Sequence, residues 1–173
     1  TMIMPRGQQL LMPVRPAFIA FSVAVVFLLS LLPLGGFVWM PDFLMLVLAF
    51  WAMHHPQRMP MSVAFLLGLG VDVQQTALLG QHALAYVLVV YVAQRFSRRM
   101  MWFSPVTQAL QMLPVFALAH LLQMLIRMLA GGMFPGISIA LAPVLEMLLW
   151  PIVSAILLAP QRRAPDADSN RPL

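Results

Sequence analysis

Six long apolar runs dominate the sequence, and short polar, glycine-containing or proline-containing breaks separate them. A membrane-spanning helix needs about 20 mainly apolar residues. Only 9% of the residues are charged and 62% are hydrophobic, whereas a soluble domain carries about 25% charged residues. The sequence therefore predicts an all-α integral membrane protein, built as a bundle of six transmembrane helices. The runs lie at residues 17–34, 39–53, 61–75, 77–94, 102–129 and 139–158.

The positions of the arginines predict the orientation of this bundle. All ten basic residues are arginines. In a six-helix arrangement, only Arg127 falls on one side of the membrane, and the others fall on the opposite side. Cytoplasmic loops carry an excess of Lys and Arg, so both termini are predicted to be cytoplasmic. The net charge of +5 is therefore interpreted as a topology signal, and no nucleic-acid partner is expected. The arginines on the cytoplasmic side are Arg6, Arg15, Arg58, Arg95, Arg98, Arg99, Arg162, Arg163 and Arg171.

The chain divides into three segments. Residues 1–16 are predicted to be a cytoplasmic lead-in, residues 17–159 a six-helix membrane domain, and residues 160–173 a disordered cytoplasmic tail that is polar and contains prolines. The first apolar run is longer than the core of a typical signal peptide, and no small-residue cleavage site follows it. We therefore expect it to be a retained helix.

Four ionisable side chains lie inside the apolar runs: Asp72, His120, Arg127 and Glu146. At 1.5 Å per residue, Asp72 lies about 16 Å from the cytoplasmic start of its helix, and Glu146 about 12 Å from the outer end of its own. All four can share the outer half of the bundle interior. His120, Gln123 and Arg127 form one stripe, which should face protein rather than lipid. The stripe is either a relay or binding site, or a structural pair that holds the helices together; we favour the structural interpretation.

The runs at 61–75 and 77–94 are so close in sequence that we expect a tight helical hairpin. Gln81 and His82 follow Gly80 and are predicted to cap the second helix, with partner or headgroup contact as the alternative. Asp72 is interpreted as a buried anchor that locks this hairpin, against either Arg127 or the helix start at Gln81 and His82. Asp42, after a proline, is a candidate N-cap of its own helix.

No pattern for enzyme chemistry is present. The sequence has no GxSxG, HExxH or P-loop motif, and its few acidic residues are scattered. The adjacent His54 and His55 do not face each other on a helix, and no cysteine exists to hold a metal. We therefore expect no catalytic residues, no metal and no cofactor.

Three segments resemble the rod-shape-determining MreD family. The central one, residues 67–86 (LGLGVDVQQTALLGQHALAY), pairs a G-x-x-x-D helix end with an L-G-Q-x-A-L helix start. The others are residues 41–61 (PDFLMLVLAFWAMHHPQRMPM) and residues 147–153 (MLLWPIV). Together they extend the resemblance over about residues 17–160. The central segment carries most of its specificity.

The resemblance implies a non-enzymatic scaffold in the bacterial inner membrane, within the elongation (rod) complex that keeps cells rod-shaped. Members are expected to bind the membrane helix of MreC and, through it, to associate with MreB, with RodA and with its transpeptidase partner, so supporting peptidoglycan synthesis. The candidate structural or partner-binding residues are then Asp72, Gly80, Gln81, His82, His120, Arg127 and Glu146.

The family is also similar in fold to the substrate-binding membrane subunits of energy-coupling-factor vitamin transporters. That similarity leaves two alternatives to the scaffold. The chain is either a vitamin-binding subunit with an outward cavity near Arg127 or Glu146, or a protein that binds the lipid of a wall precursor through Arg127. Similarity of fold alone does not establish a ligand.

Overall fold

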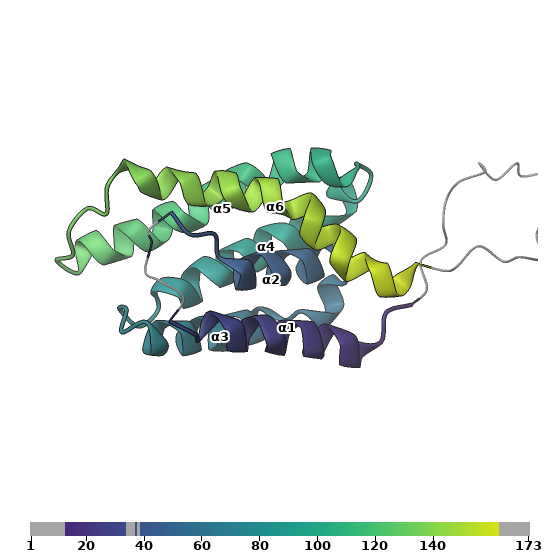
Figure 1. The fold of residues 1–173 in the computed structure, drawn as a ribbon, viewed down its shortest axis with the longest axis horizontal. Coiled ribbons are helices and arrows are strands. Elements are labelled where there is room, and N and C mark those ends of the chain that lie inside the picture. The colour runs from purple at the N-terminus through teal and green to yellow at the C-terminus, as the bar shows by residue number, and fades with distance from the viewer. Residues whose placement is uncertain (1–12, 34–36, 38, 163–173) are drawn as a thin grey trace, which may run out of the picture.

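The computed structural model describes residues 13–33, 37 and 39–162, and this part of the chain contains six α-helices and no β-strand (Figure 1). Each helix falls within or close to one of the six apolar runs, so the all-helical prediction is confirmed. The predicted lead-in, up to residue 12, and the tail from residue 163 lie outside the described residues. The helices are α1 (Pro16–Ser30), α2 (Phe43–His54), α3 (Met61–Gln74), α4 (Gln81–Met100), α5 (Pro105–Leu129) and α6 (Leu141–Leu158), with short 3-10 helices η1 (Pro56–Arg58), η2 (Ile137–Ala140) and η3 (Ala159–Gln161).

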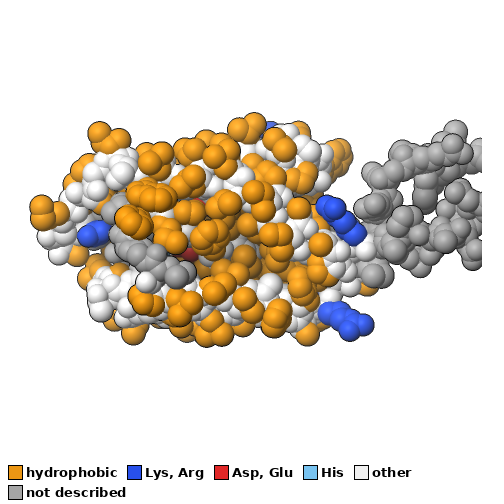
Figure 2. All heavy atoms as spheres, viewed as in Figure 1, with side chains coloured by type: hydrophobic (Ala, Val, Ile, Leu, Met, Phe, Trp, Pro, Cys, Tyr) orange, Lys and Arg blue, Asp and Glu red, His pale blue; other side chains and the backbone are white. Residues whose placement is uncertain are grey.

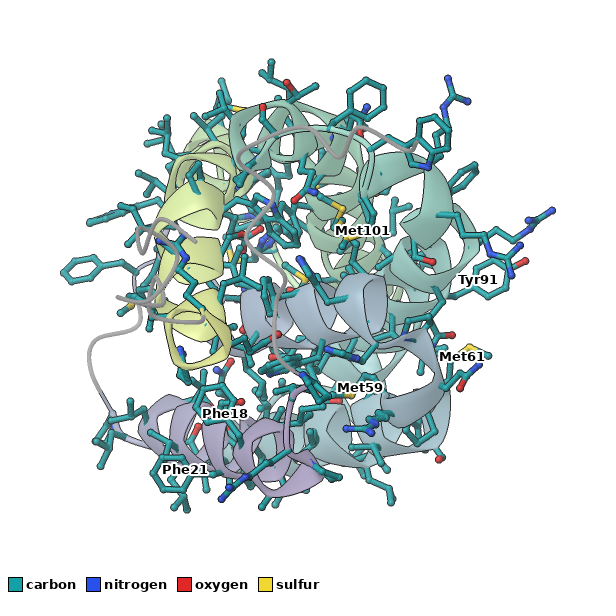
Figure 3. The ribbon with its side chains drawn as sticks, turned by 90° about the vertical axis from the view of Figure 1, so that its right-hand side faces the viewer. Phe18, Phe21, Met59, Met61, Tyr91 and Met101 are labelled. Carbon is teal, nitrogen blue, oxygen red and sulfur yellow. The ribbon has the colours of Figure 1, made fainter. Side chains whose placement is uncertain are left out.

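Helix α2 forms the centre of the bundle. Its residues 44–53 are all buried, and it packs against α1, α4 and α6. A helix that is apolar on every side is a core helix, and the end-on view shows α2 enclosed by its neighbours (Figure 3). Trp51 fixes α1 to this core, because its Nε1 donates to Ser22 Oγ at 2.9 Å and its ring meets Phe18 edge to face.

Helix α4 differs from its predicted extent at both ends. It begins at Gln81 rather than near residue 77, and it continues to Met100 through three arginines. The apolar pattern ends at Gln94 because the last turns are polar. Arginine nevertheless has a high helix propensity, so the helix extends beyond the apolar run.

The arginines of the described residues lie mainly at one end of the bundle. Arg58 donates to Val14 O at 2.8 Å, and Gln94 donates to Pro56 O at 3.1 Å. These bonds bring the start of α1, the η1 turn and the end of α4 together, and α6 ends on the same side (Figure 1). Arg127, in the last turn of α5, lies at the opposite end. This asymmetry is the one that the positive-inside rule requires.

The sides of the bundle are apolar. Figure 2 shows hydrophobic side chains over most of the visible face, with the visible arginines mainly near its ends. Phe21 and Tyr91 point away from the bundle (Figure 3), and Phe21 is 65% exposed. Two helical segments, Pro105–Leu129 and Ile137–Gln161, are long and apolar enough to cross a membrane, whereas α1, α2 and α3 are apolar but shorter. A soluble monomer rarely exposes so much continuous apolar surface.

Helices α3 and α4 approach each other closely at Gly68. A Cβ atom at this position would lie 2.6 Å from Ala83 N and 2.9 Å from the carbonyl carbon of His82. Both are backbone atoms of α4, so they cannot move without moving the helix. The glycine therefore sets the spacing of the hairpin, as small residues commonly do in membrane bundles.

We predict that Gly68→Ala destabilises the fold by about 1–3 kcal/mol, because overpacking must push α3 and α4 apart. Gly70→Ala, two residues further along α3, is the matched control. Its added methyl group meets only the tip of the Phe27 ring, which can rotate away. Unfolding in detergent micelles, followed by tryptophan fluorescence, measures both variants. Equal losses for the two would contradict the close approach at Gly68.

Candidate functional site

Asp72 lies at the junction of α3 and α4 with its side chain fully buried. Its carboxylate accepts the backbone N–H groups of Gly80 at 2.9 Å and His82 at 2.8 Å. The His82 ring Nδ1 is also 2.8 Å from Asp72 Oδ1, and donates if this nitrogen carries the proton. The first N–H groups of a helix have no partner within the helix, and the positive end of its dipole favours an anion. Asp72 is thus a cap for α4 that is supplied by the preceding helix.

This geometry distinguishes the two partners that the sequence allowed for Asp72. The carboxylate contacts the helix start at Gly80 and His82, and no ion pair joins it to Arg127 among the described residues. Gly80 adopts φ +102°, a left-handed conformation that glycine adopts without steric cost. That conformation directs the chain into α4 so that the N–H groups of Gly80 and His82 reach the Asp72 carboxylate.

A second polar network, around Glu146, joins α2, α4, α5 and α6. The fully buried Glu146 lies with Oε1 2.7 Å from His120 Nε2 and 3.0 Å from Asp42 N. Asp42 in turn accepts Met45 N–H at 3.1 Å, which confirms it as the N-cap of α2, and accepts the Tyr86 hydroxyl at 2.6 Å. Helices α6, α5, α2 and α4 are therefore tied together through side chains and one backbone N–H.

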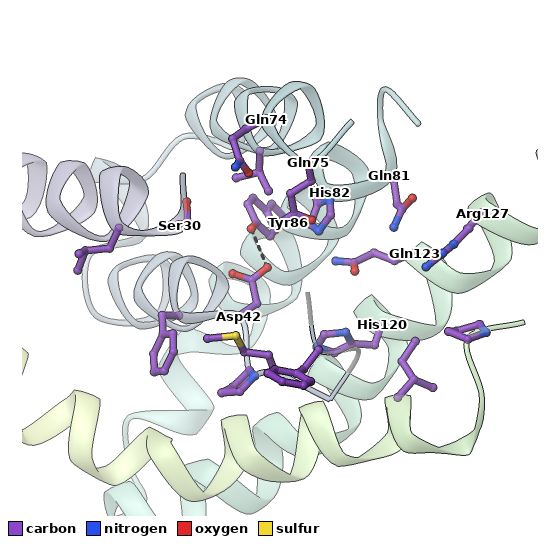
Figure 4. Close-up of a pocket in the computed structure, with 18 of the residues that line it drawn as sticks. Ser30, Asp42, Gln74, Gln75, Gln81, His82, Tyr86, His120, Gln123 and Arg127 are labelled. Atoms are coloured by element: carbon purple, nitrogen blue, oxygen red, sulfur yellow. Dashed lines mark hydrogen bonds between the residues drawn. The ribbon is translucent and has the colours of Figure 1, made fainter. Parts of the chain in front are cut away.

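A cavity of about 820 Å³ lies between these two networks, at the end of the bundle opposite the arginine-rich end. Figure 4 shows Asp42, Tyr86, His82 and His120 along its inner part, and Gln123 and Arg127 extending toward it from α5. Its remaining polar lining comes from Ser30, Gln74, Gln75 and Gln81.

The structure places the predicted site residues in two groups. Gln81, His82, His120 and Arg127 line the cavity, while Asp72 and Glu146 lie behind it and hold His82 and His120. Gly80 forms the turn before α4. The structural pair is not one between Arg127 and a carboxylate, because Asp72 and Glu146 each pair with a histidine and Arg127 forms no ion pair among the described residues.

Two residues of this site are not indicated by the sequence pattern. Tyr86 lies within an apolar run, and Asp42 is indicated only as a helix cap, although the two form a hydrogen bond across 44 positions. A tyrosine hydroxyl buried in an apolar run needs a polar partner, which is the signal that could have indicated it. The identity of the partner depends on how α2 and α4 pack.

The polar groups around this cavity offer hydrogen bonds and one cationic side chain. In the described residues, no group of three His, Cys, Asp or Glu side chains is placed to hold a metal ion. Asp72, Asp42 and Glu146 accept hydrogen bonds that fix helices.

The comparison with known protein families matches one family model, described as rod shape-determining protein MreD, over residues 9–160. The match covers most of the chain and both polar networks. The chain belongs to the MreD family. This family acts in rod-shape determination, is membrane-associated, and consists of shape-determining structural proteins rather than known enzymes. No curated protein and no solved structure matches the chain, so the similarity to vitamin-transporter subunits stays a prediction.

We predict that Asp72→Asn destabilises this MreD-family chain by about 2–4 kcal/mol. The asparagine loses the charge and turns an NH2 group toward donors in a buried site. His82→Asn should cost less, because the ring supplies only one of the contacts to Asp72. Chemical unfolding in micelles gives both values. If Asp72→Asn left the free energy of unfolding unchanged, or if His82→Asn lowered it more, the cap would not be what holds the hairpin.

The two tyrosines of the chain allow a matched test of the second network. Tyr86→Phe removes the hydroxyl that donates to Asp42 and should cost about 1–2 kcal/mol. Tyr91, on the same helix, is 52% exposed and should tolerate the same change with almost no loss. Thermal melting of the two variants side by side measures the difference. Equal melting temperatures would mean that the Tyr86–Asp42 bond does not stabilise the bundle.

Proposed function

We propose that this chain is a non-enzymatic, multi-pass scaffold of the bacterial inner membrane. In this proposal it binds the membrane helix of MreC and supports peptidoglycan synthesis within the elongation complex. MreB, RodA and its transpeptidase partner then associate with it indirectly. Membership of the MreD family is the observation that carries the proposal, and the distribution of polar and apolar groups supports it.

The proposal includes six membrane crossings with both termini in the cytoplasm. Helix α2 has 12 residues and is about 18 Å long, which is shorter than a hydrocarbon core of about 30 Å. Because α2 is enclosed by protein, its polar ends need not reach the headgroups. Helices α1 and α3 have 15 and 14 residues, and local thinning of the bilayer accommodates short spans.

A scaffold role fits the way in which the polar side chains are used. Asp72, Asp42 and Glu146 each accept hydrogen bonds that fix the ends or the packing of helices. The outward surface is apolar along the sides. In a membrane, helices associate through van der Waals packing and small residues, so such a surface suits a partner helix that lies alongside it.

Photo-crosslinking in membranes that contain MreC tests the partner and maps its contact face. A crosslinking amino acid is introduced singly at outward-facing sites on five helices, and MreC adducts are scored on gels. We expect adducts from sites on neighbouring helices that form one continuous strip. The sites are Phe21, Leu66, Tyr91, Leu118 and Ile152, all exposed in the bundle.

Two controls make this experiment decisive. The same crosslinker at Trp102, which is 89% exposed in the turn between α4 and α5, reports contacts made outside the membrane helices. Adducts from Trp102 alone, or equal adducts from every helix, would contradict docking along the bundle. Depletion of the chain in a rod-shaped host provides the cellular readout: rod shape and wall incorporation should be lost, and their persistence would contradict the role itself.

A further inference from the structure

The cavity at the arginine-poor end of the bundle has two kinds of wall. One part carries amide, imidazole and guanidinium groups, and the other part is apolar and comes mainly from α1, α3 and the segment before α2. Its volume of about 820 Å³ lies within the 300–1,000 Å³ range of small-molecule sites. We propose that this cavity binds an amphiphile with an anionic headgroup, held by Arg127 and Gln123.

Gln123 is the first observation that points to a ligand. Its residue is 8% exposed, and its Nε2 has no hydrogen-bond partner among the described residues. The amide extends from α5 toward the middle of the cavity, between His82 and His120 in the view of Figure 4. A buried donor without a partner costs about 1–3 kcal/mol. Nε2 is closed to solvent in this conformation, so a small rotation of the amide toward the cavity is needed before an acceptor oxygen on a bound molecule removes that cost.

Arg127 is the second observation, because it brings a positive charge to the same wall. It lies one helical turn beyond Gln123 on α5 and forms no ion pair among the described residues. The absence of a side chain at Gly132 leaves room for the Arg127 stem, since a Cβ there would lie 2.7 Å from Arg127 Cγ. The guanidinium is directed toward Gln123 and Gln81 (Figure 4). Its planar fork suits phosphate or carboxylate oxygens.

Each acidic group near the cavity already has at least one donor, although Glu146 Oε2 has none among the described residues. Asp42 accepts the Tyr86 hydroxyl and Met45 N–H. Asp72 accepts N–H groups at the start of α4, and Glu146 is paired with His120. The remaining polar lining is made of amides and a hydroxyl, which can donate or accept, and of Arg127, whose positive charge has no ion partner among the described residues and therefore favours an anion over a cation.

The apolar part of the lining indicates an amphiphile rather than a free ion. Val26 and Leu29 of α1, together with Phe37, Phe43 and Val71, line the cavity. Leu29 and Phe37 are 51% and 61% exposed, so this wall continues onto the apolar side of the bundle. A headgroup bound at Arg127 can thus leave its hydrocarbon chain against α1. This inference requires neither MreC nor the rod complex.

Native mass spectrometry of the full chain in a neutral detergent tests the inference. The probes are dioleoyl phosphatidic acid, dioleoyl phosphatidylcholine as a lipid without net charge, and inorganic phosphate as the anion without a chain. We expect phosphatidic acid to bind at one saturable site at least about tenfold more tightly than either other probe. If inorganic phosphate bound as tightly as phosphatidic acid, the ligand would not need a hydrocarbon chain, and the proposal of an amphiphile would be overturned. If phosphatidylcholine bound as tightly, the proposal of an anionic headgroup would be overturned.

Three variants separate this site from general attraction of anionic lipid to arginine. Arg127→Gln should weaken phosphatidic acid binding about tenfold, whereas Arg99→Gln, an exposed arginine at the other end of the bundle, should leave it unchanged. Gln123→Leu removes the unpartnered amide, so it should weaken binding without lowering the melting temperature. Equal effects of the two arginine variants, or unchanged binding by Gln123→Leu, would overturn the proposal.

Discussion

The bundle depends on hydrogen-bonding the first turn of α4 within an apolar interior. Backbone N–H groups at a helix start have no partner of their own, and lipid offers none. Asp72 solves this problem by accepting Gly80 N–H and His82 N–H from the end of α3. The interaction also fixes where α4 begins, and so determines which of its residues face α2 and α5.

The second network applies the same physical solution at the start of α2. Asp42 caps α2, its own N–H donates to Glu146, and its carboxylate receives the Tyr86 hydroxyl. In this way the few acidic residues of the described chain each hold a helix or a pair of helices. The cavity lies between the two networks. On its α5 wall, Gln123 Nε2 has no hydrogen-bond partner and Arg127 forms no ion pair among the described residues.

This distribution connects the fold with the proposed roles. Polar contacts position helices inside the bundle, and apolar side chains cover the sides where a partner helix or lipid packs. The cavity opens onto the side of the bundle along α1, so a ligand there leaves the sides formed by the other helices free for a protein partner. Among the described arginines, Arg127 alone lies at the end of the bundle that holds the cavity. The arginine-rich turns lie at the opposite end.

The sequence by itself determined the all-helical class, the six helices and the existence of an anchored hairpin. Apolar runs, glycines and arginines mark the helices and the turns between them, so they leave a pattern along the chain. It also indicated that Asp72, His120, Arg127 and Glu146 need partners, since ionisable groups in apolar helices are costly. Only the tertiary structure decided which partners they have. Glu146 and His120 are 26 positions apart, and Tyr86 and Asp42 are 44 apart, so their pairing follows from how helices pack rather than from spacing along one helix. The same packing created the cavity, whose lining comes from distant parts of the chain.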